Sequence, residues 1–479
     1  MLVFLDELSR RRLSTDVCIV GGGPAGLTLA MELEAQGIDV VLCEGGGLEG
    51  TPESQECYEG ETVGDEYHYL DVARLRYLGG TSNHWTGVCA DLADEDFAAK
   101  PAAPETAWPI GPEELRPYIT RARDMLDLPP TLDPQPVLDG AFARLDVKKT
   151  DRLRFRDMYL EDLIASQKVT TILNANLTDL ETEDQRVKEM HFHDYEDRRI
   201  TVAAKHFVIA CGGIENARLL MHFNAEFGTE FGTASGALGA YFTEHPHGNM
   251  GEYVLFDGAA LNFDSYGSDF SFTTAHIAPT EKFLAEGRVL NMRLKFQQYR
   301  HETSKQVVED LLCTAPKLAE RLTKADCAGR VGMILEQAPI KENRIELGTE
   351  RDRFGIRHPT LYWHWSEQDR QTAREIGLAF ARRMAEADIG RMSLSDWVLD
   401  SSIEVRSNEH ITAFHHIGAT RMAASAEDGV VDPDCRVFGS DNLFLAGSSV
   451  FPSCGHANPT APIMGLALRL ADHLAALQV

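Results

Sequence analysis

The sequence of 479 residues predicts an α/β fold in which a Rossmann-type, dinucleotide-binding domain is interleaved with an α+β substrate-binding domain on a mixed antiparallel sheet. Three observations predict it. A strand, a glycine-rich turn, a helix and a second strand follow one another near the N-terminus. Strand-like segments of the same kind return in the middle and at the end of the chain. The sequence between them has a different texture.

The first unit is a βαβ arrangement. Asp16–Val20 is an apolar run that enters a glycine-rich turn, and Leu27–Gln36 has the pattern of a helix that stops at Gly37. Ile38–Cys43 is continuously apolar, which is typical of a parallel strand buried on both faces.

Later segments complete the same domain. We expect strands at Thr170–Leu180, Val187–Asp194, Arg198–Ile209 and Asn442–Leu445, and helices at Ile214–Phe223 and after Pro459.

The segment from about 250 to 405 contains the second domain. We expect strands at Val289–Gln297, Arg330–Gln337 and Asn343–Leu347, a helix at Glu367–Ala385 and a solvated amphipathic helix over 301–326. The predicted dinucleotide-binding domain is therefore discontinuous (1–100, 165–250 and 405–479), and the substrate-binding domain takes 101–164 and 251–404.

Composition excludes some classes of partner. The 74 acidic and 46 basic residues give a net charge of -28, which disfavours nucleic acid and anionic membranes. The nine cysteines follow no framework spacing, so we expect reduced thiols. The first residues have no apolar signal region and no run approaches a membrane span of roughly 20 residues, so we expect a cytoplasmic protein.

The turn Gly21–Gly26 (GGGPAG) fits the G-x-G-x-x-G pattern of dinucleotide sites. Gly21 makes the tight turn, Gly23 lets the backbone approach a pyrophosphate, and Gly26 allows close packing of helix and strand. Glu44 ends the second strand, where its carboxylate can accept hydrogen bonds from a ribose. The predicted contacts are Gly21, Gly23, Pro24, Ala25, Gly26 and Glu44. A glycine turn without a ligand is the weaker alternative in this context, but these residues do not separate NAD from FAD.

Two further blocks of sequence distinguish FAD from NAD through their resemblance to a known family. Gly79–Thr86 (GGTSNHWT) and the stretch His415–His473 resemble the glucose–methanol–choline (GMC) oxidoreductases, in the branch of pyranose oxidase and bacterial sugar dehydrogenases. Supporting blocks are Val208–Arg218, Leu238–Pro246 and Glu336–Leu347, whereas residues 250–330 match no pattern. The resemblance implies FAD as the cofactor.

The resemblance also implies roles for single residues. Gly79, Gly80 and Ser82, with Asn83, would wrap the flavin edge, and Thr86 would lie near flavin N5. His84 matches a histidine that joins the flavin 8α-methyl covalently in pyranose oxidase; a loop histidine beside non-covalent FAD is the alternative. Further implied contacts are Leu177 at the adenine, Ala210 and Gly212 at a second turn, Gly447 and Ser448, and Pro459 and Thr460 at a helix end that faces the flavin.

The family's active site pairs a histidine with a second histidine or an asparagine. His415 matches the base and Asn458 the hydrogen-bond donor. Histidine suits the base because its ordinary pKa is about 6.5, and an amide can hold a developing alkoxide. His416 and His456 are rivals for these roles, and packed core histidines are the bland alternative.

We therefore expect an FAD-dependent enzyme that oxidises an alcohol, with a secondary hydroxyl of a sugar or glycoside as the preferred substrate. Electrons would pass to oxygen, a quinone or a protein; no metal is expected, and an oligomer is compatible with the sequence. Other classes remain open: a redox-silent FAD-containing lyase, a nicotinamide dehydrogenase and a non-enzymatic flavoprotein. Trp363 and Trp365 could stack on a sugar, although alternating aromatic residues on a strand are more often core.

Overall fold

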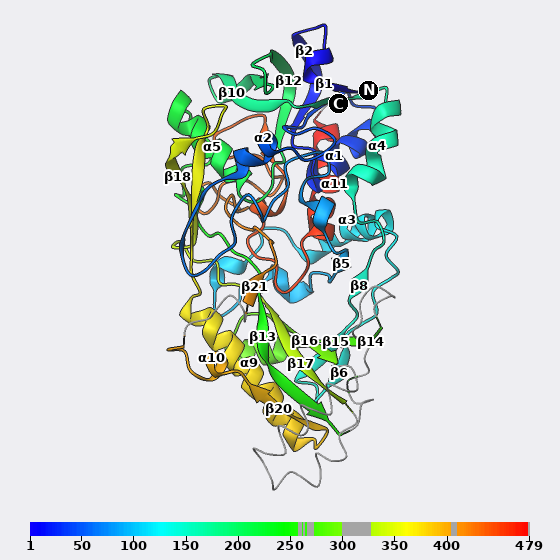
Figure 1. Cartoon of the computed structure of the whole chain (residues 1–479), viewed down its shortest axis with the longest axis vertical. Helices are drawn as coiled ribbons and strands as arrows, with labels where there is room; N and C mark the ends of the chain where they lie inside the picture. The colour runs from blue at the N-terminus through cyan, green and yellow to red at the C-terminus, as the bar shows by residue number, and fades with distance from the viewer. Residues whose placement is uncertain (257–260, 262–263, 266–272, 299–326, 404–409, 478–479) are drawn as a thin grey trace.

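The computed structural model describes residues 1–256, 261, 264–265, 273–298, 327–403 and 410–477. Two large sheets occupy opposite halves of an elongated molecule, with both termini in the half of the first sheet (Figure 1). The helix expected over 301–326 lies outside the described residues.

The first sheet has eight strands in the order β1-β9-β3-β2-β12-β11-β10, with β22 beside β12. Its strands are β1 (Leu2–Phe4), β2 (Arg12–Val20), β3 (Val40–Cys43), β9 (Val169–Leu173), β10 (Asn176–Glu183), β11 (Arg186–His193), β12 (Arg199–Ile209) and β22 (Leu443–Leu445). The pairs from β1 to β12 and the pair of β12 with β22 are parallel, whereas β10 and β11 add an antiparallel edge.

Helices cover this sheet because the contact buries the apolar faces of both helix and sheet. α1 (Pro24–Ala35) lies on β2, β3 and β9, and the C-terminal helix α11 (Thr460–Ala476) packs on α1. The apolar residues Ile463, Leu466, Leu470 and Leu474 recur at helical spacing along α11; the three leucines are buried, and Ile463 is half-buried. Other helices of this half are α2 (Pro52–Gln55), α3 (Pro112–Met125), α4 (Phe155–Ala165) and α5 (Glu215–Phe227).

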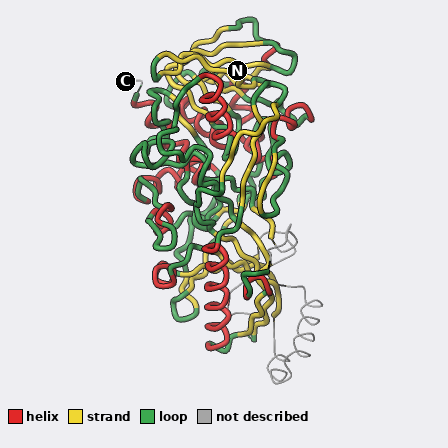
Figure 2. The backbone as a smooth tube through the Cα atoms, turned by 90° about the vertical axis from the view of Figure 1, so that its left-hand side faces the viewer, coloured by secondary structure: helices red, strands yellow, loops and turns green. Residues whose placement is uncertain are grey.

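The second sheet has nine strands in the order β20-β13-β17-β16-β15-β7-β6, with β14 beside β15 and β21 beside β13, and every pair is antiparallel. Its strands are β6 (Gln135–Val137), β7 (Phe142–Leu145), β13 (Pro246–Leu255), β14 (Asp264–Ser265), β15 (Thr273–Pro279), β16 (Met292–Gln298), β17 (Cys327–Leu335), β20 (Gly390–Leu394) and β21 (His410–Thr412). The long helix α9 (Glu367–Glu386) runs alongside it (Figure 2) and contacts β16 and β20.

Smaller elements complete the described chain. A three-stranded sheet joins β18 (Arg344–Arg351), β19 (Arg357–Trp363) and β4 (Glu61–Gly64), and β5 (Val88–Cys89) pairs with β8 (Lys148–Lys149). The short helices α6 (Glu281–Gly287) and α10 (Asp396–Leu399) belong to the half of the second sheet.

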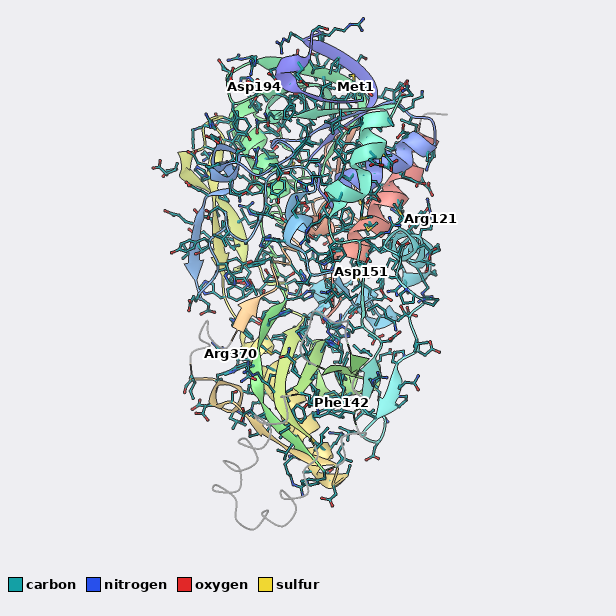
Figure 3. The ribbon with its side chains drawn as sticks, turned by 45° about the vertical axis from the view of Figure 1, so that its right-hand side comes forward. Met1, Arg121, Phe142, Asp151, Asp194 and Arg370 are labelled. Carbon is teal, nitrogen blue, oxygen red and sulfur yellow. The ribbon has the colours of Figure 1, made fainter. Side chains whose placement is uncertain are left out.

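The predicted elements differ from the observed ones mainly where a turn interrupts an apolar run. The sequence predicts one strand over Thr170–Leu180, but this segment forms β9 and β10, because Asn174 adopts a left-handed conformation with φ of 57° and turns the chain. The segment 101–164 is divided between the two halves. Its helix α3, with the labelled Arg121, packs on α11, whereas Phe142 lies in the second sheet (Figure 3).

Two further findings concern the whole described chain. Seven of its cysteines carry free thiols, and these are buried except for the half-buried Cys211. Among the described helices, none combines the length and the apolar character that crossing a bilayer requires.

Candidate active site

A cavity of about 640 Å³ is lined from both large sheets. The glycine-rich turn after β2 forms one part of its wall, and β13, β16 and β17 of the second sheet contribute His247, Arg293 and Ile334 to another. Its volume is typical of sites for cofactors and small molecules.

The glycines of the turn after β2 have different surroundings, which are compatible with the roles that the motif predicts. Gly21 has φ of 106°, a conformation that favours glycine. A Cβ on Gly26 would lie 1.9 Å from the carbonyl oxygen of Gly21, so glycine permits the close packing of helix and strand. A Cβ on Gly23 would meet no atom within 4 Å, which leaves room for a ligand against the backbone.

Two other cavity glycines repeat this open arrangement. Gly212, after β12, and Gly447, after β22, both have positive φ, and a Cβ on either would meet nothing within 4 Å. With Gly23 they form a bare backbone cradle at the carboxyl ends of neighbouring parallel strands, where Rossmann folds hold dinucleotides. Because Ala446 precedes Gly447 where many FAD proteins have an acid, contacts there would come from the backbone.

Glu44 is fixed at the edge of the cradle. Its two carboxylate oxygens accept hydrogen bonds from the backbone N–H groups of Gly22 (2.7 Å) and Gly46 (2.8 Å). Carboxylate oxygens have further lone pairs for ribose hydroxyls. The nearby Arg76, which the motif did not reveal, also lines the cavity and donates to the hydroxyl of Tyr195 at 2.9 Å.

The loop predicted to surround the flavin edge is the 3₁₀ turn Gly80–His84. The Ser82 hydroxyl donates to the carbonyl of Gly79 (2.7 Å), and the Asn83 amide donates to the carbonyl of Leu78 (2.9 Å). Gly26, Gly79 and Asn83 therefore shape the backbone and do not line the cavity. The predicted residues that do line it are Gly21, Gly23, Pro24, Ala25, Glu44, Gly80, Ser82, His84, Thr86, Leu177, Ala210, Gly212, His415, Gly447, Ser448, Asn458, Pro459 and Thr460.

His84 lies at an exposed part of the cavity wall. Its ring stacks on that of Phe414, with centroids 6.1 Å apart and planes 15° from parallel. Partial burial and the positive charge of Arg154 lower the pKa of His84. The imidazole is therefore neutral near pH 7 and has a free electron pair on one ring nitrogen.

His415 follows β21 and belongs to a chain of hydrogen bonds that determines its tautomer. Its Nδ1 lies 2.7 Å from Nδ1 of His245, and Nε2 of His245 lies 2.8 Å from the carbonyl oxygen of Gly455. A carbonyl oxygen only accepts, so Nε2 of His245 carries the proton and its Nδ1 is an acceptor. Nδ1 of His415 must then be the donor, which leaves Nε2 of His415 as an unprotonated nitrogen.

Burial and the positive charges around it keep this pair neutral. Burial lowers the pKa of His245 to about 3. Burial, the neighbouring histidines and Arg293 hold the pKa of His415 well below its usual range. Within the described part of the chain, Nε2 of His415 has no protein partner, so it is available as a base.

Glu244 holds the backbone of both histidines of this pair. One of its carboxylate oxygens accepts the backbone N–H groups of His245 (2.9 Å) and His415 (2.7 Å), and the other accepts the hydroxyl of Tyr67 (2.9 Å). Burial raises the pKa of Glu244 to about 7. This carboxyl therefore holds the two histidines at the backbone and titrates near neutral pH.

Asn458 is oriented by a cation. Nη2 of the fully buried Arg293 donates to the side-chain oxygen of Asn458 at 3.2 Å. The amide nitrogen of Asn458 is then the group that can donate to a substrate, and no described residue accepts its hydrogen bonds. An amide donor in this position can hold an oxygen that becomes negative.

His416 and His456, the alternative candidates for the base and the donor, lie in different surroundings. His416 also touches the cavity, but it is buried against Tyr67 and Phe242, and its Nε2 lies 4.0 Å from Glu244. His456 is buried outside the cavity wall. Trp363 and Trp365 are 2% and 8% exposed in the core of the second domain, so they do not form a sugar platform.

The sequence motifs do not predict the residues that the second sheet contributes to the cavity. Strands of the second sheet carry His247, His276, Arg293 and Lys295, which line the cavity, and His245 immediately precedes β13. The only signal was the pair of histidines around Pro246, at the end of a block noted for its resemblance.

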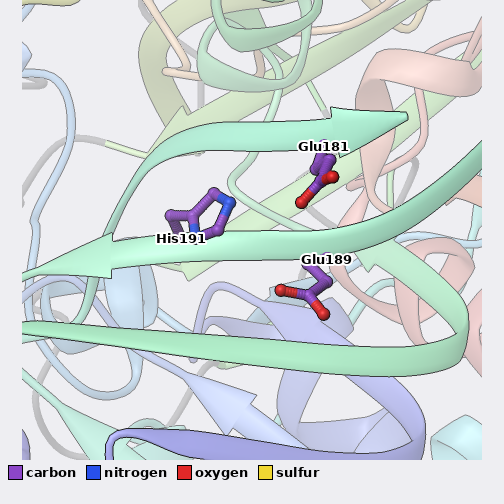
Figure 4. A group of neighbouring side chains, drawn as sticks. All are labelled: Glu181, Glu189 and His191. Atoms are coloured by element: carbon purple, nitrogen blue, oxygen red, sulfur yellow. The ribbon is translucent and has the colours of Figure 1, made fainter. Parts of the chain in front are cut away.

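A second cluster of polar side chains, shown in Figure 4, does not line the cavity. Ligand atoms of Glu181, Glu189 and His191, on β10 and β11, lie within 4.8 Å of one another. Glu189 is already paired with Arg12, and Nδ1 of His191 lies 3.0 Å from the hydroxyl of Thr201. These bonds account for Glu189 and His191 within the sheet, and Glu181 is exposed on the edge strand β10.

Family comparisons agree with this architecture. Residues 339–467 match the family model described as GMC oxidoreductase, and residues 15–222 match that described as pyridine nucleotide-disulphide oxidoreductase. The second match spans β2 to α5 and so includes the glycine cradle up to Gly212.

Curated relatives resemble parts of the chain. The fructose dehydrogenase large subunit of Gluconobacter japonicus is 26% identical over 321 residues, which are 63% of this chain and 53% of the relative. The oxygen-dependent choline dehydrogenase of Sinorhizobium medicae is 38% identical over 77 residues, 16% of this chain and 14% of the relative. The chain thus spans about half the length of the first relative and much less of the second.

Solved structures resemble the whole chain in fold. Pyridoxine 4-oxidase from Mesorbium loti superposes with a TM-score of 0.59 at 15% identity, covering 96% of this chain and 99% of the other. Formate oxidase gives a TM-score of 0.60 at 15% identity, covering 98% and 99%. The predicted fold class, a Rossmann-type domain with an interleaved substrate-binding domain, is confirmed. The C-terminal part of this chain is thus similar to the GMC oxidoreductases, and the chain as a whole shares the fold of pyridoxine 4-oxidase and formate oxidase.

Proposed function

We propose that this protein binds FAD and oxidises an alcohol (CH–OH) group, and that the preferred substrate is a sugar or glycoside whose secondary hydroxyl becomes a ketone. One observation carries the proposal. A nitrogen base, Nε2 of His415, and an amide donor, Nδ2 of Asn458, belong to residues that line the same cavity as the bare glycine cradle. Alcohol oxidation needs this combination of base, oxygen-binding donor and adjacent cofactor.

The cradle fits FAD by its open backbone, by its hydrogen-bonding groups and by the helix that begins beside it. Gly23, Gly212 and Gly447 leave open backbone, Glu44 offers acceptors for a ribose, and Pro459 and Thr460 begin a helix of 17 residues at the cavity. The positive end of that helix dipole would favour a ligand that becomes negative. When bound, FAD would supply the acceptor for the hydrogen of the carbinol carbon.

The chain's own residues would handle the proton and the oxygen. Nε2 of His415 removes the hydroxyl proton, and the bond from its Nδ1 to His245 strengthens as the ring becomes positive. Nδ2 of Asn458 donates to the oxygen as it becomes alkoxide-like, and Arg293 keeps the amide in this orientation.

The finer parts of the proposal rest on resemblance. The loop with His84 and the pair of His415 and Asn458 resemble the sugar-oxidising branch that contains pyranose oxidase, which favours a sugar substrate and a covalent link through His84. The fructose dehydrogenase relative supports the sugar assignment. Electrons would then pass to oxygen, a quinone or a protein; names of dehydrogenases and oxidases both occur among the similar proteins.

The test is reduction of the bound flavin without oxygen. Purified protein is mixed anaerobically with sugars, glycosides and simple alcohols, and loss of the yellow absorbance is followed. Bleaching by an alcohol is expected, and Asn458→Asp should slow it by about 10²–10³ because a donor is replaced by an acceptor. Yellow protein that no alcohol bleaches would contradict the redox proposal and favour the lyase alternative, whereas protein that stays colourless when given FAD would contradict the cofactor.

A further inference from the structure

The wall of the cavity on the second sheet carries positive charge. Along β16, Arg293, Lys295 and Gln297 line the cavity at alternate positions, while the residues between them are buried in the core. This alternation follows from the two-residue period of a strand.

Neighbouring strands add neutral imidazoles to these cations. His276 on β15 is paired with Lys295, and Ile334 on β17 is paired with both Arg293 and His247. Burial holds the pKa of His276 well below its usual range and lowers that of His247 to about 3. The wall therefore combines two basic side chains, Arg293 and Lys295, with two neutral rings that can form hydrogen bonds.

The carboxylates of the cavity lie elsewhere. Among its described lining residues, the only acids are Glu44, Glu215 and Asp352. Backbone N–H groups hold Glu44, while Glu215 and Asp352 are ion-paired with the buried Arg218. None of these acids belongs to the wall of the second sheet.

Lys295 in particular has no anionic partner in the described chain. Burial and the charge of Arg293 both lower its pKa, and no described carboxylate acts in the opposite direction. Two neighbouring cations on a cavity wall are also unexpected in a chain with 74 acidic and 46 basic residues. A partly desolvated ammonium is stabilised when an anion comes within hydrogen-bond distance.

We propose that Lys295, with Arg293 beside it, forms an anion subsite, so that the substrate is a hydroxy compound bearing a carboxylate or phosphate group. A sugar acid and a sugar phosphate both have this chemistry. The inference rests on the proposed function and makes its substrate class more specific. Arg293 holds Asn458 at the reacting hydroxyl, and two residues along a strand span about 6.6 Å. The anionic group would therefore lie several bonds from the carbon that is oxidised.

The test compares binding of a neutral sugar with binding of its anionic relatives. The holoenzyme is titrated anaerobically by calorimetry with D-glucose, D-gluconate and D-glucose 6-phosphate. At least one anion should bind about tenfold or more tightly than D-glucose, because a charge-assisted hydrogen bond is gained. A preference for gluconate identifies a carboxylate, and a preference for the sugar phosphate identifies a phosphate. Binding of neither anion more tightly than D-glucose would overturn the inference.

Variants connect any preference to Lys295. Lys295→Met should bring the ratio of anion to glucose affinity close to one, and Lys295→Arg should retain it; Lys295→Gln serves if the Met variant does not fold. Lys282→Met is the matched control, because that lysine is exposed on α6 of the same domain and outside the cavity wall. A preference that survives loss of the Lys295 charge would overturn the subsite. Flavin bleaching distinguishes failure of the anion subsite from failure of the proposed alcohol oxidation. If an alcohol bleaches the flavin but anions bind no more tightly than D-glucose, only the subsite is refuted. If anions bind more tightly but no alcohol bleaches the flavin, only the oxidation is refuted.

Discussion

His245 and His415 are 170 residues apart in the chain, yet their Nδ1 atoms lie 2.7 Å from each other. His245 immediately precedes β13 of the second sheet, and His415 follows β21, the strand paired with β13. The carbonyl of Gly455 fixes the proton of His245, which fixes that of His415. The free nitrogen of the proposed base is thus determined by the tertiary structure.

The first prediction concerns His415 itself. His415→Ala should lower the rate of flavin reduction by alcohol by about 10²–10⁴, because the general base is removed, while FAD stays bound. Stopped-flow absorbance under nitrogen measures the rate. His456→Asn is the comparison, since His456 is outside the cavity wall, and it should reduce flavin at close to the original rate. Normal reduction in the His415 variant would refute its role as base.

The second prediction concerns the positioning role of His245. His245→Phe should lower kcat by about tenfold or more with little change in KM, because His415 loses the acceptor that fixes its tautomer. His245→Asn should recover part of the loss, since its amide oxygen can accept from Nδ1 of His415. Equal loss in both variants would indicate a purely structural role for this residue.

The third prediction is a pH dependence that belongs to Glu244. Burial raises the pKa of this carboxyl to about 7, whereas that of His415 lies well below its usual 6.5. As pH rises through 7, Glu244 becomes negative, strengthens its bonds to the backbone of His245 and His415, and favours a positive His415 ring. The rate of flavin reduction should rise through this range. A pH series with Glu244→Gln should lack the step, and a step that persists would assign it to another group.

The fourth prediction separates binding from folding in the glycine motif. Gly23→Ala should fold normally but hold FAD more weakly, because its Cβ would enter open space in the cradle. Gly26→Ala should destabilise the fold by about 1–3 kcal/mol, since its Cβ would collide with the carbonyl oxygen of Gly21. Thermal melts of the apoproteins and FAD titrations distinguish the two effects. The same outcome for both variants would contradict the assigned roles.

The fifth prediction concerns the link between His84 and the flavin. After denaturation with acid, the yellow colour should remain with the precipitated protein, and His84→Ala should release it into the supernatant. Colour released from the unaltered protein would show that FAD is held without a covalent bond. Alcohol oxidation would stand in that case, but the likeness to pyranose oxidase at His84 would not.

Much of this site could be predicted from the sequence because its signals are local. The spacing of the motif predicts separate roles for Gly21, Gly23 and Gly26, and the surroundings of each glycine in the structure are compatible with its predicted role. Short motifs near the C-terminus predict His415 and Asn458 as site residues, and both line the cavity. Hydrophobic periodicity likewise predicted β2, α1, β3 and α9, whereas the turn at Asn174 was missed because a single left-handed residue leaves no periodic signal.

By itself, the sequence determined the Rossmann-type unit, the glycine cradle and the two candidate catalytic residues, since backbone conformation and short motifs depend on near neighbours in the chain. The tertiary structure decided the tautomer of His415, the orientation of Asn458 and the charge of the substrate wall. These depend on His245, Arg293 and Lys295, which antiparallel pairing of distant strands brings to the cavity. A hydrogen bond between residues 170 positions apart leaves no mark on either local pattern.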